Sequence, residues 1–300
     1  MPELPEVESL RKSLIPFIVG QKIIKITVTK PKLVSDKGTK RVESETKVNQ
    51  FISELEKEYI KSLERRAKNL ILTTLSGKII LIHLKMTGQL VYKSKNPEEA
   101  GVHGGHPIAL SEVEVPNKHS HIIFELEHGT LYFNDTRMFG YVLYFSDQES
   151  LDAENHFDKL GVEPFSESFS LDYFKKAMKG RKGNLKSLLL SQEVVVGLGN
   201  IYCDEVCFDS KILPTRSAET LSLSELTKMY YSTLKIMDLA VEAGGSSVAN
   251  YLLGDGTKGN YAKQHKVYNR GGKKCLVCGT ILKSQKLAGR TTVYCKVCQA

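Results

Sequence analysis

The stretch CLVCGTILKSQKLAGRTTVYCKVC, residues 275–298, decides the fold at the C-terminal end of the chain. It contains two Cys-x2-Cys pairs, Cys275 with Cys278 and Cys295 with Cys298, which are separated by sixteen residues. This spacing is typical of a four-cysteine zinc site. Each pair supplies two thiolates from one tight turn, and two such turns close a tetrahedron that leaves no position for water. We therefore predict one Zn2+ ion with a structural role.

The residues between the two pairs predict a β-hairpin. Residues 280–286 and 291–294 have the composition of two short strands, and Ala288-Gly289-Arg290 would form the turn between them. Arg290 would then lie at the tip of a ribbon. The alternative is that Arg290 is an ordinary solvated arginine.

Positive charge gathers around this ribbon. The chain has 300 residues and a net charge of +8, and residues 261–300 contain nine lysines and arginines but no acidic residue. Tyr261, Tyr268, Tyr294 and the four cysteines are interleaved with these charges. This mixture favours a folded module that binds a polyanion over a solvated tail, and nucleic acid is the expected partner.

The composition also indicates a compartment. No apolar stretch approaches the roughly 20 residues of a membrane span, and the N-terminus lacks the basic-then-apolar order of a signal peptide. We expect a cytoplasmic, nucleoid-associated protein that does not contact a membrane. Cys203 and Cys207 lie four residues apart without a second pair nearby, so we expect packed or free thiols.

The N-terminus, Met1-Pro2-Glu3, suggests covalent chemistry. Removal of Met1 would leave Pro2 with a free secondary amine whose pKa lies near ~8, so that part of it is nucleophilic at neutral pH. Attack on a sugar C1′ would give an iminium, which draws electrons from C2′ and lets an attached phosphate leave by elimination. Glu3 could protonate the opened sugar. The alternative is a proline that merely begins the chain.

The middle of the chain predicts two domains of the α+β class. Val7, Leu10 and Leu14 form one face of a first helix, with Pro5 in its first turn and Pro16 and Gly20 at its exit. Six β-like segments follow and predict a β-sandwich with flanking helices, a barrel being the alternative closure; they are 22–28, 69–75, 78–84, 121–127, 131–134 and 141–145.

The pattern becomes helical after a polar stretch at 148–170. Val196-Gly197-Leu198-Gly199-Asn200 separates two apolar helical runs, 184–191 and 200–209, which predicts a helix-turn-helix with Asn200 as N-cap. The glycines would expose amides beside a helix N-terminus, which attracts phosphate. A helix pair used only for packing is the commoner alternative.

Six motifs together resemble the formamidopyrimidine-DNA glycosylase family, in its Fpg/MutM branch, over nearly the whole chain. They are Pro2–Glu8, Arg65-Arg66-Ala67-Lys68, His83–Gly88, Asp135–Gly140, Gly197–Tyr202 and the ribbon from Val267 to Gln299. The resemblance implies a catalytic β-sandwich domain at 1–147, a linker at 148–170, a helix-two-turn-helix domain at 171–262 and a zinc ribbon at 263–300.

The resemblance also implies roles for individual residues. Pro2 would form the Schiff base, Glu3 would be the acid, Lys68 would assist β-elimination, and Arg290 would contact phosphate and assist δ-elimination. A trio would fill the gap left by an extruded nucleotide, and it corresponds to Met86, Arg137 and Phe139. Phosphate contacts would fall to His119, Arg137, Arg181 and Asn200, with Lys186 as a weaker candidate. Met86 and Phe139 could instead be core residues.

The chain departs from the family pattern at a few positions. Lys85 stands where glycine is common, and Met138 stands where arginine is common. The segment 93–115 is longer than usual, and we expect its His103 and His106 to belong to a polar loop rather than a metal site. The segment 244–261 resembles the loop that closes over an extruded oxidised purine.

The expected function is therefore base-excision repair. A monomer would act on double-stranded DNA with oxidised purines (8-oxoguanine and formamidopyrimidines) or abasic sites, as a glycosylase and as an AP lyase that proceeds by β,δ-elimination. One alternative is the endonuclease VIII branch, which acts on oxidised pyrimidines. The other is a protein that binds DNA damage without catalysis.

Overall fold

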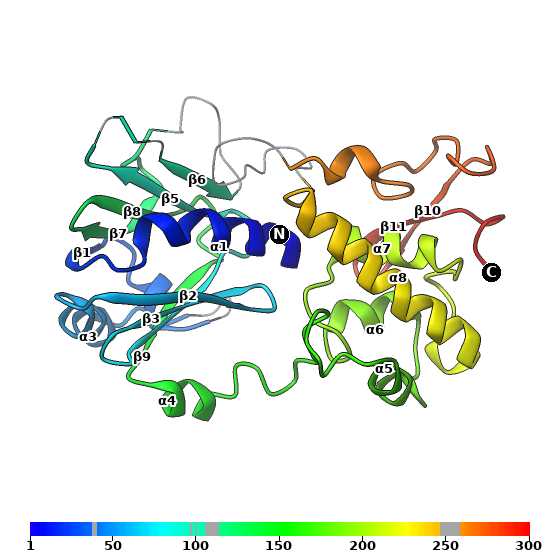
Figure 1. The fold of residues 1–300 in the computed structure, drawn as a ribbon, viewed down its shortest axis with the longest axis horizontal. Coiled ribbons are helices and arrows are strands. Elements are labelled where there is room, and N and C mark those ends of the chain that lie inside the picture. The colour runs from blue at the N-terminus through cyan, green and yellow to red at the C-terminus, as the bar shows by residue number, and fades with distance from the viewer. Residues whose placement is uncertain (38–40, 97, 100, 106–113, 247–258) are drawn as a thin grey trace. The chain divides into compact units, whose positions relative to one another are not determined.

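The computed structural model describes residues 1–300 except 38–40, 97, 100, 106–113 and 247–258. The chain divides into two compact units, which are drawn in Figure 1. Unit 1 comprises Met1–Phe157 together with Gly244–Gly259, and unit 2 comprises Asp158–Ala243 together with Asn260–Ala300. The division after Phe157 falls inside the polar stretch 148–170, whereas the return of Gly244–Gly259 to unit 1 has no signal in the sequence.

Unit 1 contains two antiparallel sheets, which confirms the mixed helix and sheet class. One has the strand order β1-β7-β8-β5-β6 and the other the order β2-β3-β4-β9. The strands are β1 Ile23–Val28, β2 Ile60–Arg66, β3 Asn69–Thr74, β4 Ile79–His83, β5 Gly88–Ser94, β6 Val102–Gly105, β7 Ser120–Leu126, β8 Gly129–Asp135 and β9 Tyr141–Phe145. Its helices are α1 Leu4–Ile18, α2 Lys32–Ser35, α3 Glu45–Leu55 and α4 Gln148–Ala153.

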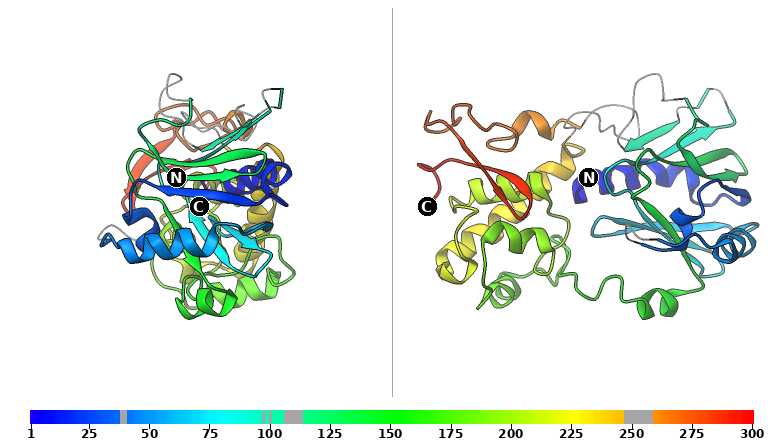
Figure 2. Two further views of the ribbon diagram at one scale, coloured as in Figure 1. Left: turned by 90° about the vertical axis from the view of Figure 1, so that its left-hand side faces the viewer. Right: turned by 180° about the vertical axis from the view of Figure 1, so that it is seen from behind.

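The first helix packs against both sheets. Figures 1 and 2 show α1 beside them, and it contacts β2 and β3 of one sheet and β6 of the other. The predicted face of Val7, Leu10 and Leu14 is buried in a core shared with strands from both sheets. Pro16 lies inside the last turn rather than beyond the helix, since α1 continues to Ile18. A proline there removes one internal hydrogen bond, and its ring crowds the carbonyl of Lys12 one turn earlier.

Unit 2 consists of helices followed by the ribbon. The helices are α5 Leu171–Met178, α6 Leu185–Ser191, α7 Asn200–Asp209 and α8 Leu223–Glu242, with short 3-10 turns η2 Ala218–Thr220 and η3 Tyr261–Gln264. The ribbon strands are β10 Lys283–Leu287 and β11 Arg290–Tyr294. The two short strands between the cysteine pairs are thus present, shifted by a few residues from the predicted bounds.

Two buried acids of α7 connect the helices to the ribbon. Asp204 accepts a hydrogen bond from Lys186 Nζ at 2.7 Å and another from the Val293 amide at 3.0 Å. Glu205 accepts from three successive backbone amides, those of Lys266, Val267 and Tyr268. Buried carboxylates need such partners because an unpaired buried charge is costly. Glu205 therefore fixes the start of the ribbon segment on α7, and Asp204 fixes the second strand of the ribbon there.

In the part of the chain that the structure describes, the helices are all either too short or too polar to cross a membrane.

Candidate active site and metal site

The four cysteines of the two pairs lie together. The Sγ atoms of Cys275, Cys278, Cys295 and Cys298 are all within 4.8 Å of one another. Cys275 Sγ lies 3.9 Å from Cys298 Sγ, and Cys278 Sγ lies 3.5 Å from Cys295 Sγ. A tetrahedral zinc with Zn–S bonds of about 2.3 Å separates its sulfurs by roughly 3.8 Å, so this donor set fits zinc. Cys203 and Cys207 are buried on α7 outside this cluster, which agrees with the expectation of packed thiols.

The hairpin between the cysteine pairs closes with a two-residue turn. Leu287 pairs with Arg290, so the turn consists of Ala288 and Gly289, both with positive φ, 49° and 69°. Arg290 is therefore the first residue of β11 rather than part of a three-residue turn. It remains at the end of the ribbon, and it is exposed. The type I′ conformation, which needs two positive φ angles, explains the turn.

The N-terminal residues are held at the mouth of α1. Pro2 and Glu3 are buried, and the Glu3 amide donates to Glu6 Oε2 at 2.8 Å. The other oxygen of the same carboxylate, Oε1, accepts from the Ser246 amide at 2.6 Å. Gly245, at φ 85°, approaches Glu6 so closely that a Cβ there would lie 2.7 Å from Oε1. Glu6 thus bonds the start of α1 to the segment that returns from unit 2.

Lys68 lies in the two-residue turn between β2 and β3 and is 4% exposed. Glu8 of α1 attaches this hairpin to the helix: its Oε2 accepts from Arg65 Nε at 2.9 Å and its Oε1 from Arg11 Nη2 at 2.7 Å. Burial raises the pKa of Glu8, but the hydrogen bonds from Arg11 and Arg65 outweigh it and leave the pKa below its ordinary value. Glu8 is therefore a charged anchor between the elements that carry Pro2 and Lys68.

The next buried residue of this region is His83, the last residue of β4. Burial lowers its pKa well below the ordinary value, and the positive charges of Lys85, Lys68 and the N-terminal amine lower it further. Its Nδ1 accepts a hydrogen bond from the Lys85 amide at 3.0 Å. The charges of Lys68 and of the N-terminal amine therefore both disfavour a proton on His83.

A second group of predicted residues lies at one end of β8. Gly88 of β5 pairs with Asp135 of β8, and this register brings the turn 85–87, which contains Met86, beside the loop 136–140. Met86 is half-buried, while Arg137 and Phe139 are exposed. The Arg137 guanidinium carbon lies 4.6 Å from the centre of the Phe139 ring. The three residues therefore share one end of the sheet, and Phe139 is not a core residue.

His119 joins the same group. It precedes β7, is half-buried, and accepts a hydrogen bond at its carbonyl from the Asp135 amide at 3.1 Å. Its ring meets that of His121 edge-on, with 6.4 Å between the centroids. Four residues that the resemblance assigns to DNA contacts thus surround Asp135, which the sequence interpretation did not single out.

The predicted residues of unit 2 are more dispersed. Gly199, not Asn200, is the N-cap of α7, and Asn200 is its first helical residue. Asn200 Oδ1 is buried and has no hydrogen-bond partner among the described residues. The residue lines a pocket of about 410 Å³ with residues of the ribbon segment, namely Tyr268, Asn269, Gly271, Ser284, Thr291 and Val293. Predicting Asn200 as N-cap was wrong because Gly199 is the last extended residue and Asn200 is already helical.

The two basic candidates of unit 2 have acidic partners. Arg181 forms an exposed ion pair with Glu193 at 2.6 Å, which it would have to leave to reach a phosphate. Lys186 is fully buried in its ion pair with Asp204. Its ammonium also donates to the Thr291 carbonyl at 3.3 Å. Lys186 therefore supports the ribbon rather than presenting a charge at the surface.

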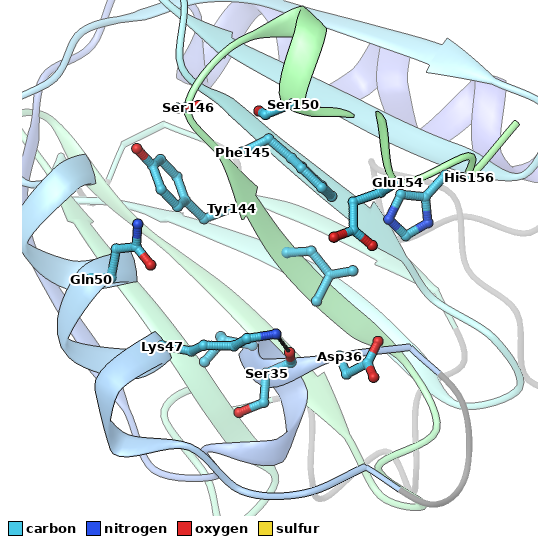
Figure 3. Close-up of a pocket in the computed structure, with 12 residues that line it drawn as sticks. Ser35, Asp36, Lys47, Gln50, Tyr144, Phe145, Ser146, Ser150, Glu154 and His156 are labelled. Atoms are coloured by element: carbon cyan, nitrogen blue, oxygen red, sulfur yellow. Dashed lines mark hydrogen bonds between the residues drawn. The ribbon is translucent and has the colours of Figure 1, made fainter. Parts of the chain in front are cut away.

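A further pocket of unit 1 contains none of the predicted site residues. Figure 3 shows it between α2, α3 and the end of β9, with a volume of about 280 Å³. Lys47 and Gln50 of α3 line one side, and Glu154 and His156 lie across from them. Lys47 Nζ donates to the Ser35 carbonyl at 2.7 Å, which is the hydrogen bond drawn in Figure 3.

Comparison with known proteins assigns all three parts of the chain. Residues 1–142 match the formamidopyrimidine-DNA glycosylase N-terminal domain, residues 160–251 the H2TH domain of the same enzyme, and residues 272–300 the zinc finger found in FPG and IleRS. The formamidopyrimidine-DNA glycosylase of Desulfitobacterium hafniense is 34% identical over the full length of both chains. That of Streptococcus pneumoniae is 36% identical over all of this chain and 99% of the relative.

Solved structures show the same fold. Lactococcus lactis Fpg in complex with DNA that contains an abasic site is 32% identical, with a TM-score of 0.83 and 99% of each chain covered. The MutM (FPG) protein of Thermus thermophilus is 30% identical, with a TM-score of 0.81, and the match covers 99% of this chain and 98% of that one.

The fold and the metal site define a DNA glycosylase with a helix-two-turn-helix domain and a zinc finger that holds one structural Zn2+. More particularly, the chain belongs to the formamidopyrimidine-DNA glycosylase (Fpg/MutM) family. It is a DNA-binding enzyme of base-excision repair.

Proposed function

We propose that this glycosylase is bifunctional: it removes oxidised purines and then cleaves the strand as an AP lyase. The observation that carries the proposal is the burial of Pro2 and Glu3 at the start of α1, the helix whose Glu8 also binds the hairpin that carries Lys68. Solved relatives hold DNA with an abasic site, with Fapy-dG and with carbocyclic 8-oxo-G, an analogue of the 8-oxoguanine nucleoside. We propose abasic sites, formamidopyrimidines and 8-oxoguanine as substrates here. The part of 244–261 that would cover the base lies mostly outside the described residues.

The proposed chemistry begins with removal of Met1. The Pro2 amine attacks C1′, the new N–C1′ bond replaces the glycosidic bond, and the base leaves with a proton. Glu3 protonates the sugar oxygen as the ring opens. Loss of a C2′ proton, assisted by Lys68, then expels the 3′ phosphate. Loss of the C4′ proton next expels the 5′ phosphate, and Arg290 assists this step. Water finally hydrolyses the iminium and restores the Pro2 amine.

We further propose a division of labour along the chain. Residues 1–147 would carry the chemistry and the wedge of Met86, Arg137 and Phe139. The DNA backbone would be held by Arg181 and Asn200 of residues 171–262 and by Arg290 of residues 263–300. His119 would add a contact from unit 1. Cationic and amide donors suit phosphate oxygens. We propose that a monomer acts in this way on the chromosome.

Borohydride trapping tests the proposal. The purified protein, with its N-terminus defined by intact mass, is reduced in the presence of a duplex with one 8-oxoguanine opposite cytosine. We expect a covalent adduct on Pro2 in wild type and none in Pro2→Gly, which should still bind the duplex. Unchanged strand cleavage by Pro2→Gly would remove Pro2 from the mechanism.

The alternatives give different results in the same assay. If wild-type protein that lacks Met1 is trapped only on duplexes with an oxidised pyrimidine, its activity is that of the endonuclease VIII branch. A protein that binds both duplexes and is trapped on neither would be a damage-binding protein.

A further inference from the structure

The side chain of Asp135 binds two loops, the turn 85–87 and the loop 136–140, which carries the exposed pair Arg137 and Phe139. It is 0% exposed, and its Oδ1 accepts from Thr87 Oγ1 at 2.5 Å and from the Arg137 amide at 3.2 Å. Its Oδ2 accepts from the Gly140 amide at 2.7 Å. One carboxylate therefore bonds the turn that contains Met86 to both ends of the loop that carries Arg137 and Phe139.

Arg41 holds the same loop from another side. It lies in the segment between α2 and α3, and it donates to the Met138 carbonyl at 2.6 Å and to the Gly140 carbonyl at 2.7 Å. Asp135 thus satisfies amides of the loop, and Arg41 satisfies carbonyls. Asp135 and Arg41 are both charged, and hydrogen bonds with a charged partner are stronger than those between neutral groups. The loop backbone is therefore bound strongly, and from two directions.

The loop conformation is one that the chain would not keep unaided. Met138 has φ 54°, in the left-handed region that a side chain other than glycine rarely adopts. Gly140 packs so tightly that a Cβ would lie 2.7 Å from the Phe133 ring and 2.9 Å from the His83 carbonyl. Strained backbone of this kind persists when its surroundings enforce it, and it is concentrated at functional sites.

We propose that Asp135 and Arg41 are positioning residues that fix the wedge of Met86, Arg137 and Phe139 before DNA arrives, an inference that rests on the proposed function. Arg137 and Phe139 are exposed, so packing against a core does not order them. Ordering a free loop on binding would consume part of the binding free energy, and a loop held in advance avoids that cost. Because Thr87 and the loop share one carboxylate, the three wedge residues enter the duplex as a unit.

The test compares substrates with and without a gap to fill. Asp135→Asn keeps the shape of the side chain but must point an NH2 group at one of its donors, and Arg41→Met removes both carbonyl contacts. On an 8-oxoguanine duplex we expect each variant to lose at least 10-fold in single-turnover rate. On a single strand with an abasic site, where no partner base must be held, we expect less than a 2-fold change. Asp152→Asn, on the surface of α4, is the matched control.

A second readout does not depend on chemistry. A duplex with a stable abasic analogue opposite 2-aminopurine reports wedge insertion as a change in fluorescence. We expect the change to be at least halved in both variants at saturating protein, while Asp152→Asn matches wild type. The variants could instead lose the same factor in rate on duplex and on single strand and still give the full fluorescence change. Asp135 and Arg41 would then stabilise the fold in general and would not position the wedge. A wild type that gives the fluorescence change but no cleavage would overturn the proposed lyase instead.

Discussion

At the scale of single residues, both departures from the family pattern lie at left-handed backbone angles. Lys85 has φ 50° and Met138 has φ 54°. Glycine is the usual residue at such angles because it has no Cβ, which agrees with the glycine that the family resemblance implies at the position of Lys85. In this chain the Lys85 ammonium lies over the Tyr141 ring, 5.5 Å from its centre. The sequence shows the substitution, but only the structure shows which backbone angle it has to accept.

His265 gives a pH-dependent prediction at the same scale. The ring is buried, with centroids 5.7 Å from Tyr261 and 5.4 Å from Tyr268, and burial lowers its pKa to about 4. The unfolded chain, with a histidine pKa near ~6.5, takes up its proton first as the pH falls. The contribution to stability is therefore complete above pH ~6.5 and is lost between pH ~6.5 and about 4, by up to about 3 kcal/mol.

Urea unfolding at pH 7.0 and pH 5.0 measures this term. Wild type should lose more stability between the two values than His265→Phe, which keeps a ring in the pocket and cannot titrate. Equal losses in both proteins would show that other groups cause the acid sensitivity. A zinc-saturated buffer at both pH values keeps the metal site constant.

At the scale of elements, the sequence predicted most of the strands of unit 1. β3, β4, β7 and β9 lie close to their predicted bounds, whereas β2, β5 and β6 were not predicted. The register of β2 against β3 shifts between Ile60 and Ser62, so its apolar residues Ile60 and Leu63 no longer alternate with period two. β5 begins at Gly88, and glycine is a residue type that is depleted in strands.

The candidate site is limited in the same way. Motifs identified the residues that the family uses, but the spacing along the chain could not show that Met86 and Arg137 become neighbours. That follows from the pairing of Gly88 with Asp135, a tertiary register that a single sequence does not specify. Asp135, Thr87 and Arg41 were not predicted because their hydrogen bonds join residues far apart in the sequence, Thr87 to Asp135 and Arg41 to Met138 and Gly140.

The ribbon turn gives a prediction at this scale. Ala288 occupies a left-handed position, φ 49°, for which asparagine is much better suited in a type I′ turn. Ala288→Asn should therefore stabilise the ribbon by about 1 kcal/mol. Gly289→Ala, at φ 69°, should destabilise it by a similar amount. Thermal unfolding of the zinc-loaded protein, followed by release of zinc to a chromophoric chelator, would measure both, and an opposite order would contradict this turn geometry.

At the scale of the whole molecule, the zinc ribbon and the helices of unit 2 depend on each other. Val293 of the ribbon and Phe208 of α7 belong to one buried cluster with Cys275 and Cys295. Metal binding to four thiolates contributes directly to folding free energy. Loss of zinc should therefore disturb the neighbouring end of α7 as well as the ribbon itself.

We predict that Cys278→Ser, or chelation of wild type, lowers affinity for duplex DNA at least 100-fold and abolishes duplex cleavage. Unit 1 has its own core and should stay folded. Hydrogen exchange would check this: peptides of residues 272–300 should lose protection, and peptides of β3 and β4 should keep it. Cys203→Ala, which removes a thiol outside the metal site, is the control. Cleavage of duplex by Cys278→Ser at the wild-type rate would contradict the prediction.

The hydrogen bonds of Glu6 have a consequence for biosynthesis. One oxygen of its carboxylate bonds the Glu3 amide, and the other bonds the Ser246 amide. A ribosome makes the chain from the N-terminus, so Glu6 emerges early and Ser246 only after the helices α5 to α8 of unit 2. Unit 1 therefore stays incomplete on the nascent chain until the helical unit has been made. The surroundings of Pro2 and Glu3 are among the last parts of the protein to be finished, although these residues are among the first to be synthesised.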